Sequence, residues 1–332
     1  MNYPSATILF LTYKQEAFVE QALLSLLAQD WPNVEIIIAD DGSPDGTMRI
    51  MHEILADYRG HIRVKIFPAE VNKGLVANWN RGVAAATGEI IIAAAGDDIS
   101  HSMRTRETMD YFSANPKCQA LYFNCRTIDS AGQVLRNPWR QFNLAQHRSL
   151  DVPTLWKGFP FNGATAAYRT AMLRQFGPLD ERCGTEDVPS LIRAQITGLA
   201  TALPQVAVDW RWHGKNLSHG SSLGSRSAKL KSKLRRAKGA FYDGLQLERD
   251  AQLALTLGLR TKDELQIAMK EGRRMSHLNR LKFHVLHPAG RWGTSIFLIF
   301  RILKSPEFFL HEKLGISVKY FLRRLVPSWL RY

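Results

Sequence analysis

The stretch that decides the fold reads Val34-Glu35-Ile36-Ile37-Ile38-Ala39-Asp40-Asp41-Gly42-Ser43-Pro44-Asp45-Gly46-Thr47. A nearly unbroken apolar run of this length is typical of a strand buried on both faces of a parallel sheet. Ligands of open parallel sheets bind beyond the carboxyl ends of the strands. The stretch therefore predicts a strand at Val34–Asp40 that delivers Asp40 and Asp41 to the ligand side of a sheet.

The surrounding hundred residues repeat this order of a strand followed by a helix. Further strands are predicted at Ala6–Leu11, Val64–Phe67 and Glu89–Ala94. Apolar residues at helical spacing predict helices at Ala17–Leu27, Thr47–Tyr58 and Val76–Ala86. This alternation is the signature of βαβ units. We therefore expect an α/β fold, with a Rossmann-like, mostly parallel sheet and helices on both faces.

Two adjacent carboxylates recur after the fourth predicted strand, in Gly96-Asp97-Asp98. Mg²⁺ and Mn²⁺ prefer carboxylate oxygens, and they take few from the protein when a substrate diphosphate supplies the rest. The pair therefore predicts a divalent-cation site. The structural alternative is a solvated pair that caps a helix near Met103, just as Ser43 or Asp45 could cap the helix after Asp41.

A third acidic pair, Glu186-Asp187, precedes a helical run at Ser190–Ile196. A carboxylate at this point could take the proton from an attacking hydroxyl, if that hydroxyl lies within hydrogen-bond reach. The structural alternative is a capping box for the helix.

A basic and aromatic segment follows, Trp210-Arg211-Trp212-His213-Gly214-Lys215. His213 is a candidate metal ligand, because a neutral imidazole binds divalent cations. Arg211 and Lys215 are candidates for pairing with phosphates.

The net charge of +14 belongs to the last third of the chain. Residues 226–332 hold 23 Lys and Arg against 8 Asp and Glu, whereas residues 1–225 hold 21 against 22. A Ser/Gly-rich stretch, His219–Ser227, separates the two parts. We therefore predict a catalytic domain at residues 1–225 and a basic, mostly helical extension at residues 226–332.

The extension also carries an apolar stripe between Leu314 and Trp329, opposed by Lys and Arg. Such a pattern suits an anionic bilayer surface. The alternative is a helical subdomain that packs on the catalytic domain with its basic face in solvent. Clustered cations also bind nucleic acid, but the interleaved Phe, Leu and Trp favour the membrane.

Composition excludes several classes of protein. The three cysteines form no CxxC pair, which indicates a reducing compartment and no structural zinc. The start of the chain lacks a basic region, and the apolar run at Ile296–Phe300 is far shorter than a bilayer span, so we expect neither a secretory signal nor a membrane-spanning helix.

Taken in order, these motifs resemble glycosyltransferase family 2, whose members have the GT-A fold. The resemblance covers about residues 5–218. The motifs that carry it are Thr12-Tyr13, Asp40–Thr47, Asn72–Leu75 with Asn80 and Gly82, Gly96–Asp98, Phe161–Thr165, Glu186-Asp187 and Arg211–Ser218. The resemblance implies inverting, metal-dependent transfer of a sugar from a nucleotide diphosphate donor, usually a UDP- or dTDP-sugar, in a single displacement.

The resemblance also implies roles for individual residues. Asp187 would be the catalytic base, Asp98 would hold Mn²⁺ or Mg²⁺, and His213 would be a second metal ligand. The implied nucleotide-sugar contacts are Thr12, Tyr13, Asp41, Ser43, Lys73, Asn80, Asp97 and Glu186. A departure is Trp79, where many members carry Arg, and Lys73 or Arg81 would then supply the positive charge.

We expect three partners: the donor, a glycan or lipid-linked oligosaccharide acceptor, and an anionic membrane surface, with no nucleic acid. The expected location is cytoplasmic and peripheral, on the inner face of the membrane, in surface polysaccharide synthesis. A catalytically inactive membrane- or nucleic-acid-binding protein is disfavoured because all the expected carboxylates are present.

Two other enzyme classes are also disfavoured. A haloacid-dehalogenase-like phosphatase places its nucleophilic Asp after the first strand, where this chain has Leu11-Thr12-Tyr13. A dehydrogenase would need a GxGxxG motif opening the first helix, which is missing.

Overall fold

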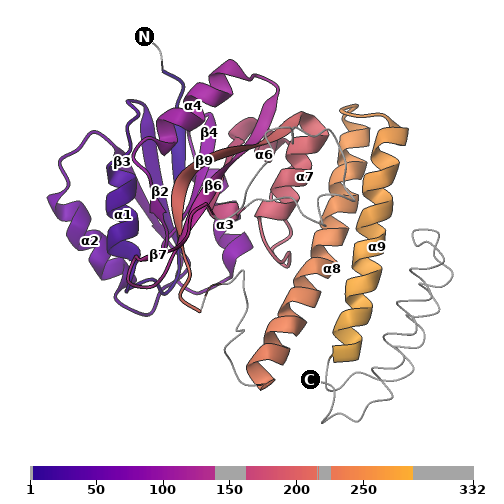
Figure 1. Cartoon of the computed structure of the whole chain (residues 1–332). Coiled ribbons are helices and arrows are strands. Elements are labelled where there is room, and N and C mark those ends of the chain that lie inside the picture. The colour runs from indigo at the N-terminus through magenta and orange to yellow at the C-terminus, as the bar shows by residue number, and fades with distance from the viewer. Residues whose placement is uncertain (1–2, 139–161, 215, 217–225, 287–332) are drawn as a thin grey trace. The chain divides into compact units, whose positions relative to one another are not determined.

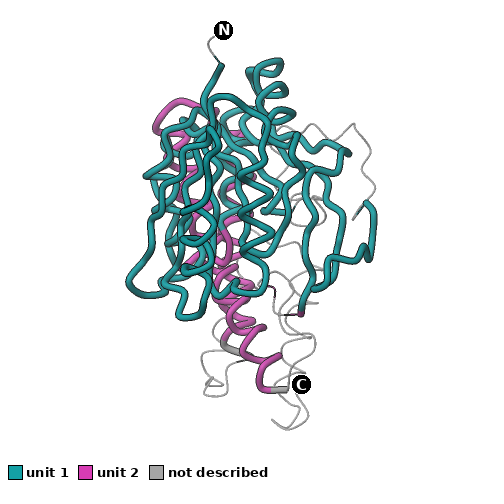
Figure 2. Tube along the Cα trace, turned by 90° about the vertical axis from the view of Figure 1, so that its left-hand side faces the viewer, with its two compact units in different colours: residues 1–181, 186–213 teal, residues 182–185, 214–332 magenta. Residues whose placement is uncertain are grey.

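The computed structural model describes residues 3–138, 162–214, 216 and 226–286. The chain divides into two compact units, coloured teal and magenta in Figure 2. Unit 1 contains residues 1–181 and 186–213, and unit 2 contains residues 182–185 and 214–332. The stripe predicted between Leu314 and Trp329, the apolar run at Ile296–Phe300 and the candidate phosphate contact Lys215 lie outside the described residues.

Unit 1 is built on a nine-stranded sheet whose strands run in the order β3-β2-β1-β4-β8-β6-β9-β5, with β7 paired to β6. The strands are β1 Ala6–Thr12, β2 Val34–Asp40, β3 Arg63–Pro68, β4 Ile90–Ala95, β5 Ile99–Ser100, β6 Cys118–Ile128, β7 Val134–Arg136, β8 Ala166–Arg169 and β9 Leu199–Arg211. The first four strands are parallel to one another. In the other half of the sheet β6 and β9 are parallel, while β8 is antiparallel to β4 and β6.

Helices cover both faces of this sheet (Figure 1). They are α1 Val19–Leu27, α2 Thr47–Asp57, α3 Leu75–Ala85, α4 Arg104–Ala114, α6 Thr170–Gln175 and α7 Asp187–Thr197, with a short 3₁₀ helix, η1, at Gly163–Thr165. Residues of α1, α2 and α4 share one apolar core with Ile8, Phe10, Ile36 and Ile38. On β1 the intervening Leu9 lies against Gly82 of α3, on the opposite face. Because side chains alternate along a strand, β1, β2 and β4 contribute to both cores, whereas the edge strand β3 is largely exposed.

The register of the parallel strands brings their carboxyl ends together. Thr12 lies beside Asp40, and Leu11 lies beside Ala95. Two backbone hydrogen bonds extend this alignment into the loops, from Asp41 N to Thr12 O and from Gly96 N to Leu11 O, both 3.0 Å. The loops after β1, β2 and β4 therefore meet at one edge of the sheet.

These findings confirm the predicted α/β fold with helices on both faces. The strand at Val34–Asp40 has the predicted bounds, and the other early strands and helices agree within about two residues. The expectation of a mostly parallel sheet holds for β1 to β4, whereas the second half is mixed. No strand was predicted beyond Ala94, so the antiparallel pairing of β8 lay outside the predicted alternation of strands and helices.

Unit 2 contains a helix pair, α8 Arg226–Thr256 and α9 Lys262–Leu286 (Figure 1). The two helices meet at Gly244 and Gly272, where a Cβ on Gly244 would lie 2.6 Å from Gly272 O. The segment 182–185 packs on α8, because Gly184 N donates to the buried carboxylate of Asp243 over 2.8 Å. The described start of the predicted extension is thus helical. Among the described helices, none combines the length and apolarity of a bilayer span.

Candidate active site

The first aspartate of the Asp40-Asp41 pair shapes the loop after β2. Its carboxylate accepts hydrogen bonds from Thr12 Oγ1 at 2.8 Å, Ser43 Oγ at 2.6 Å and Ser43 N at 2.8 Å. Asp40 is fully buried, and the hydroxyl protons of Thr12 and Ser43 point at it. Further along the same loop, the Asp45 carboxylate accepts from Thr47 N and Thr47 Oγ1 at the start of α2. The capping alternative is therefore correct for Asp45. Ser43 turns to Asp40 instead.

The second aspartate, Asp41, fastens the loop before α3. Its two oxygens accept from Lys73 N and Gly74 N, both at 2.8 Å. The side chain of Lys73 is exposed. Tyr13, at the end of β1, is 36% exposed, and the Lys14 ammonium lies 5.2 Å from its ring centre. Tyr13 and Lys73 thus present an aromatic ring and a cation at the edge where the loops meet.

The polar side chains of helix α3, Asn80 and Arg81, bond the backbone of other segments of the protein. The Asn80 amide exchanges two hydrogen bonds with the backbone of Leu179, at 2.8 and 3.0 Å. Trp79 is 2% exposed and packs edge-on against Tyr168. Arg81 donates to Phe67 O over 2.7 Å. Trp79 is therefore a core residue, and the nucleotide contact expected of Asn80 stays a prediction.

The acidic pair after β4 is held inside the protein. Asp98 is 6% exposed, and one of its oxygens accepts from the backbone N–H of Arg211 over 2.8 Å. Burial, followed by the charge of Asp97, holds the pKa of the Asp98 carboxyl well above its usual range. The helix-capping alternative is wrong, because the pair is buried and its carboxylates bond Arg211 N and His213. A buried acidic pair is a place where a cation would relieve repulsion.

His213 and Arg211 complete this cluster. His213 Nε2 lies 3.0 Å from Asp97 Oδ2, and both side chains are largely buried. The Arg211 guanidinium donates to Asp97 O at 2.9 Å, Ser130 O at 3.2 Å and Gln21 Oε1 at 2.7 Å. Since Arg211 is 1% exposed and donates to protein oxygens, the expectation that it pairs with phosphates is wrong.

The acidic cluster offers few protein ligands to a divalent cation. Among the described residues, no three His, Cys, Asp or Glu side chains gather closely enough to enclose a metal ion. The protein therefore offers a carboxylate, Asp98, and an imidazole, His213. Hard cations in nucleotide sites commonly take one or two protein ligands and fill the remaining positions from phosphates and water. The residues fit a cation that arrives together with a diphosphate.

A buried arginine that the sequence did not reveal lies behind the acidic pair. Arg104 is 2% exposed and donates to Ser100 Oγ at 2.9 Å, Ala93 O at 2.8 Å and Ala164 O at 2.9 Å. Burial lowers the pKa of Arg104 to about 10, against the opposing charge of Asp98. Arg104 thereby connects the end of β4 to η1. Its position in an Arg-rich, amphipathic helix gave no sign that it would be buried.

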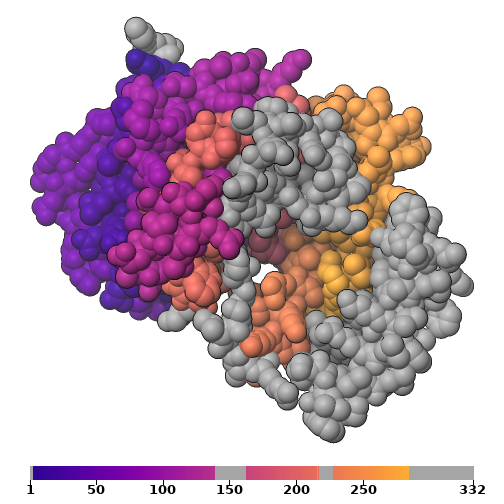
Figure 3. All heavy atoms as spheres, viewed as in Figure 1, coloured from indigo at the N-terminus to yellow at the C-terminus, as the bar shows by residue number. Residues whose placement is uncertain are grey.

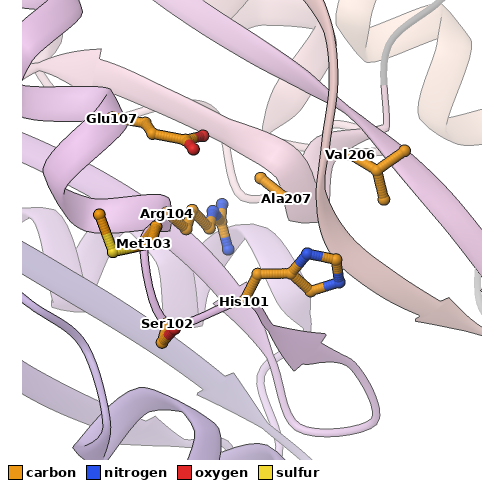
Figure 4. Close-up of a pocket in the computed structure, with 7 residues that line it drawn as sticks. All are labelled: His101, Ser102, Met103, Arg104, Glu107, Val206 and Ala207. Atoms are coloured by element: carbon orange, nitrogen blue, oxygen red, sulfur yellow. The ribbon is translucent and has the colours of Figure 1, made fainter.

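A hollow of about 490 Å³ opens beside Arg104 (Figure 4). It is lined by His101, Ser102, Met103, Arg104, Glu107, Val206 and Ala207. None of the predicted site residues lines it. The hollow is therefore distinct from the acidic cluster.

The third acidic pair opens α7. Asp187 is the first residue of the helix and is half-buried, and its Oδ1 accepts from Val188 N over 2.7 Å. Its other oxygen lies close to Gly163 of η1, where an added Cβ would come within 2.9 Å of Asp187 Oδ2. Glu186 is only 8% exposed and makes no side-chain capping bond, so it is not the acid of a capping box. Of the two carboxylates, Asp187 is the more accessible to an acceptor.

Comparisons with known proteins identify the family of the chain. The family model described as "Glycosyl transferase family 2" matches residues 7–177, just over half of the chain. A putative glycosyltransferase of Bacillus subtilis, EpsE, is 30% identical over 129 residues, which are 39% of this chain and 46% of that protein. The poly-β-1,6-N-acetyl-D-glucosamine synthase of Staphylococcus epidermidis is 30% identical over 120 residues, 36% of this chain and 28% of that protein. The chain spans about half the length of several curated relatives that it matches, EpsE among them.

Solved structures share the fold. TarS of S. aureus (residues 1–349, in complex with UDP-GlcNAc) aligns with a TM-score of 0.57 at 18% identity, over 96% of this chain and 90% of that chain. The mannosyltransferase PcManGT of Pyrobaculum calidifontis, in complex with GDP-Man and Mn²⁺, aligns with a TM-score of 0.51 at 17% identity, over 98% and 88%. At these identities the likeness concerns the fold alone.

Proposed function

The chain belongs to glycosyl transferase family 2, and from this premise we propose that it transfers a sugar from a nucleotide diphosphate donor to a hydroxyl of a glycan or lipid-linked acceptor. The observation that carries the proposal is the separation of two kinds of carboxylate. Asp97 and Asp98 form a buried pair with His213 at the end of β4, whereas Asp187 stands apart at the start of α7, beside Gly163. The buried pair suits a divalent cation, and the Asp187 carboxylate suits the hydroxyl of an acceptor.

The donor would bind where the loops after β1, β2 and β4 meet. Tyr13 offers an exposed ring on which a base can stack, and Lys73 offers an ammonium to the diphosphate. Asp41, although bonded to the 73–74 backbone, keeps lone pairs for a base N–H or a ribose hydroxyl. A UDP- or dTDP-sugar is the donor that we propose, and the UDP-GlcNAc complex of TarS supports this choice.

A divalent cation, Mn²⁺ or Mg²⁺, would when bound stabilise the negative charge that grows on the leaving nucleoside diphosphate. Asp98 and His213 would hold it, and Asp97 would orient the imidazole through its bond to Nε2. The Mn²⁺ complex of PcManGT supports this assignment.

Asp187 would act as the general base. It would accept the proton of the acceptor hydroxyl while that oxygen attacks the anomeric carbon, so that the configuration inverts in one displacement without a covalent intermediate. The turn at Gly163 leaves room for the carboxylate, because any larger residue would place a Cβ against it. Glu186, which is more buried, would shape the site from the adjacent position.

The proposal extends to the place of action. The first three turns of α8 expose six cationic side chains: Lys229, Lys231, Lys233, Arg235, Arg236 and Lys238. The orange atoms of α8 reach the surface in Figure 3. Such a cluster suits an anionic membrane surface. We therefore propose that the enzyme works at the cytoplasmic face of a membrane, on a lipid-linked acceptor in polysaccharide synthesis.

The decisive experiment is the substitution Asp187→Asn. The amide keeps the shape of the side chain and loses the proton acceptor, so turnover should fall by about a hundredfold or more. Affinity for the nucleotide sugar, measured by calorimetry, should stay near that of the wild type. The control is Glu181→Gln, which removes an exposed carboxylate six residues earlier and should leave turnover unchanged. Near wild-type transfer by Asp187→Asn would remove Asp187 as the base and leave Glu186 as the alternative.

A further inference from the structure

The first turn of α1 contacts the segment that carries His213. The ring centre of Phe18 lies 4.9 Å from that of His213, with the two planes tilted by 35°. The guanidinium carbon of Arg211 lies 4.9 Å from the centre of the same Phe18 ring. One turn further along α1, Gln21 accepts a hydrogen bond from Arg211 over 2.7 Å. A single aromatic ring thus contacts both an imidazole and a guanidinium.

These two partners hold the acidic loop after β4. Arg211 donates its backbone N–H to the Asp98 carboxylate, and its Nε donates to the carbonyl oxygen of Asp97. His213 is bonded to the Asp97 carboxylate. Because both partners of Phe18 are attached to the acidic pair, the position of the ring is coupled to the geometry of both aspartates.

Local rules do not explain an aromatic residue at this point. Phe18 is the N-cap of α1, where Ser, Thr, Asp and Asn are favoured because their side chains bond the first free N–H groups. Phe18 makes no such capping bond. It is half-buried and does not belong to the apolar core that α1 shares with the sheet. When an N-cap side chain neither bonds the helix nor packs in the core, local stability does not explain it, and such departures are expected at functional sites.

We propose that Phe18 is a positioning residue of the donor site. Its ring packs against the His213 imidazole and the Arg211 guanidinium, and so holds the imidazole in the orientation in which it meets the cation and diphosphate. This inference rests on the proposed function, since it assigns a residue to the same site. Aromatic rings attract a guanidinium placed over their face, and groups that orient metal ligands typically change metal affinity by about tenfold or more when removed.

The test compares Phe18→Leu with Phe18→Tyr in the full chain. Leu is apolar and of similar size but has no ring, whereas Tyr keeps the ring. Mn²⁺ is titrated calorimetrically in the presence of whichever of UDP, dTDP or GDP the wild type binds. Phe18→Leu should weaken Mn²⁺ binding by about tenfold, and Phe18→Tyr should bind like the wild type. Leu24→Ala is the matched control, because Leu24 is an apolar residue of α1 that is 48% exposed.

A double-mutant cycle separates positioning from a general loss of structure. If the ring acts through His213, Phe18→Leu should have little further effect on Mn²⁺ affinity in a His213→Ala background. Equal losses in both backgrounds, or wild-type affinity in Phe18→Leu, would overturn the inference and leave the proposed function intact. A wild-type protein that binds none of the three nucleotides with Mn²⁺ would instead overturn the proposed function, and this inference with it.

Discussion

Four aspartates, three at or after strand ends and one at the start of α7, differ in what surrounds their oxygens. Asp40 accepts from Thr12 and Ser43 and is structural, whereas Asp41 bonds the 73–74 backbone and stays at the donor edge. Asp98 is buried and beside a second carboxylate, and Asp187 is flanked by a glycine. The sequence predicted that Asp40, Asp41 and Asp98 lie at or after strand ends, because the apolar runs before them mark those strands. It could not predict that Asp40 is structural, because that depends on side-chain partners brought together only in the fold.

At the residue scale, Asp98→Asn should stabilise the protein in the absence of metal. The folded state raises the pKa of this carboxyl through burial and through the charge of Asp97, so holding it at neutral pH costs stability. The amide removes that cost and can still accept the Arg211 N–H. The melting temperature without metal should rise by about 2 to 4 °C, the shift typical of roughly 1 kcal/mol in a protein of this size.

The same variant should lose its response to metal. Mn²⁺ with a nucleoside diphosphate should raise the melting temperature of the wild type, because binding to the native state alone stabilises it. Asp98→Asn should show little such rise, and its sugar transfer should be lost. Full wild-type transfer in EDTA would contradict the assignment of Asp98 to a cation.

At the scale of elements, the prediction succeeded where pairing is local. The apolar run at Val34–Asp40 and the helices that flank it follow from patterns within a few residues of one another. The contacts that complete the site join distant elements, as when Phe18 of α1 meets Arg211 at the end of β9. The spacing of apolar residues in the sequence cannot predict a contact between segments this far apart. Phe18 and Arg104 were therefore missed, and the helix predicted at Ala17–Leu27 put Phe18 inside the helix, whereas the structure makes it the N-cap.

At the amino-terminal end of the parallel strands, Glu35 joins β2 to its neighbours β1 and β3. Glu35 of β2 accepts from Thr7 Oγ1 of β1 at 2.8 Å, from Thr87 N and Oγ1 at 2.7 Å, and from Lys65 Nζ of β3 at 3.2 Å. Burial by itself would raise the pKa of Glu35, but the hydrogen bonds from Thr87, Thr7 and Lys65 outweigh it, and the pKa is lowered. The carboxylate thus fastens three strands far from the acidic cluster.

Glu35→Gln should therefore destabilise the protein at neutral pH by about 1 to 3 kcal/mol, the usual cost of impairing a buried hydrogen-bond network. A lowered folded pKa gives stability that is present above the unfolded value of about 4.3 and is lost as the pH falls through the folded value. The difference in unfolding free energy between wild type and variant, measured with denaturant, should accordingly shrink below about pH 4. A difference that stays constant down to pH 3 would show that the ionised carboxylate is not the stabilising form.

At the scale of the whole chain, the family match and the excess of positive charge lie in different parts of the sequence. The family match at residues 7–177 falls in unit 1, while the excess of Lys and Arg falls after residue 225. Inside unit 2, Asp243 and Gly184 join α8 to the segment 182–185, and α8 packs on α9. One side of α8 thus packs within unit 2. The six cations near the start of α8 are exposed, so helical packing and contact with an anionic surface are compatible.

The six exposed cations of α8 lead to the last prediction, which concerns the membrane. Each Lys or Arg close to an anionic leaflet contributes about 1 kcal/mol, and the attraction falls off within a Debye length, about 10 Å at 0.1 M salt. A few engaged residues are therefore enough for reversible binding. The protein should pellet with vesicles that contain phosphatidylserine at low salt, and it should be partly released at high salt.

Two variants locate the contact. Changing the six cations of α8, residues 229, 231, 233, 235, 236 and 238, to Gln should weaken pelleting, and removal of residues 226–332 should abolish it. The matched control changes Arg59, Arg63 and Lys117, which are exposed cations of unit 1, and should pellet like the wild type. If the α8 variant pellets normally and only the truncation fails, the contact lies beyond α8. Equal pelleting with neutral and anionic vesicles, or full binding after truncation, would mean that the basic helix serves only packing and solubility, and the proposal of a membrane-bound acceptor would lose its physical basis.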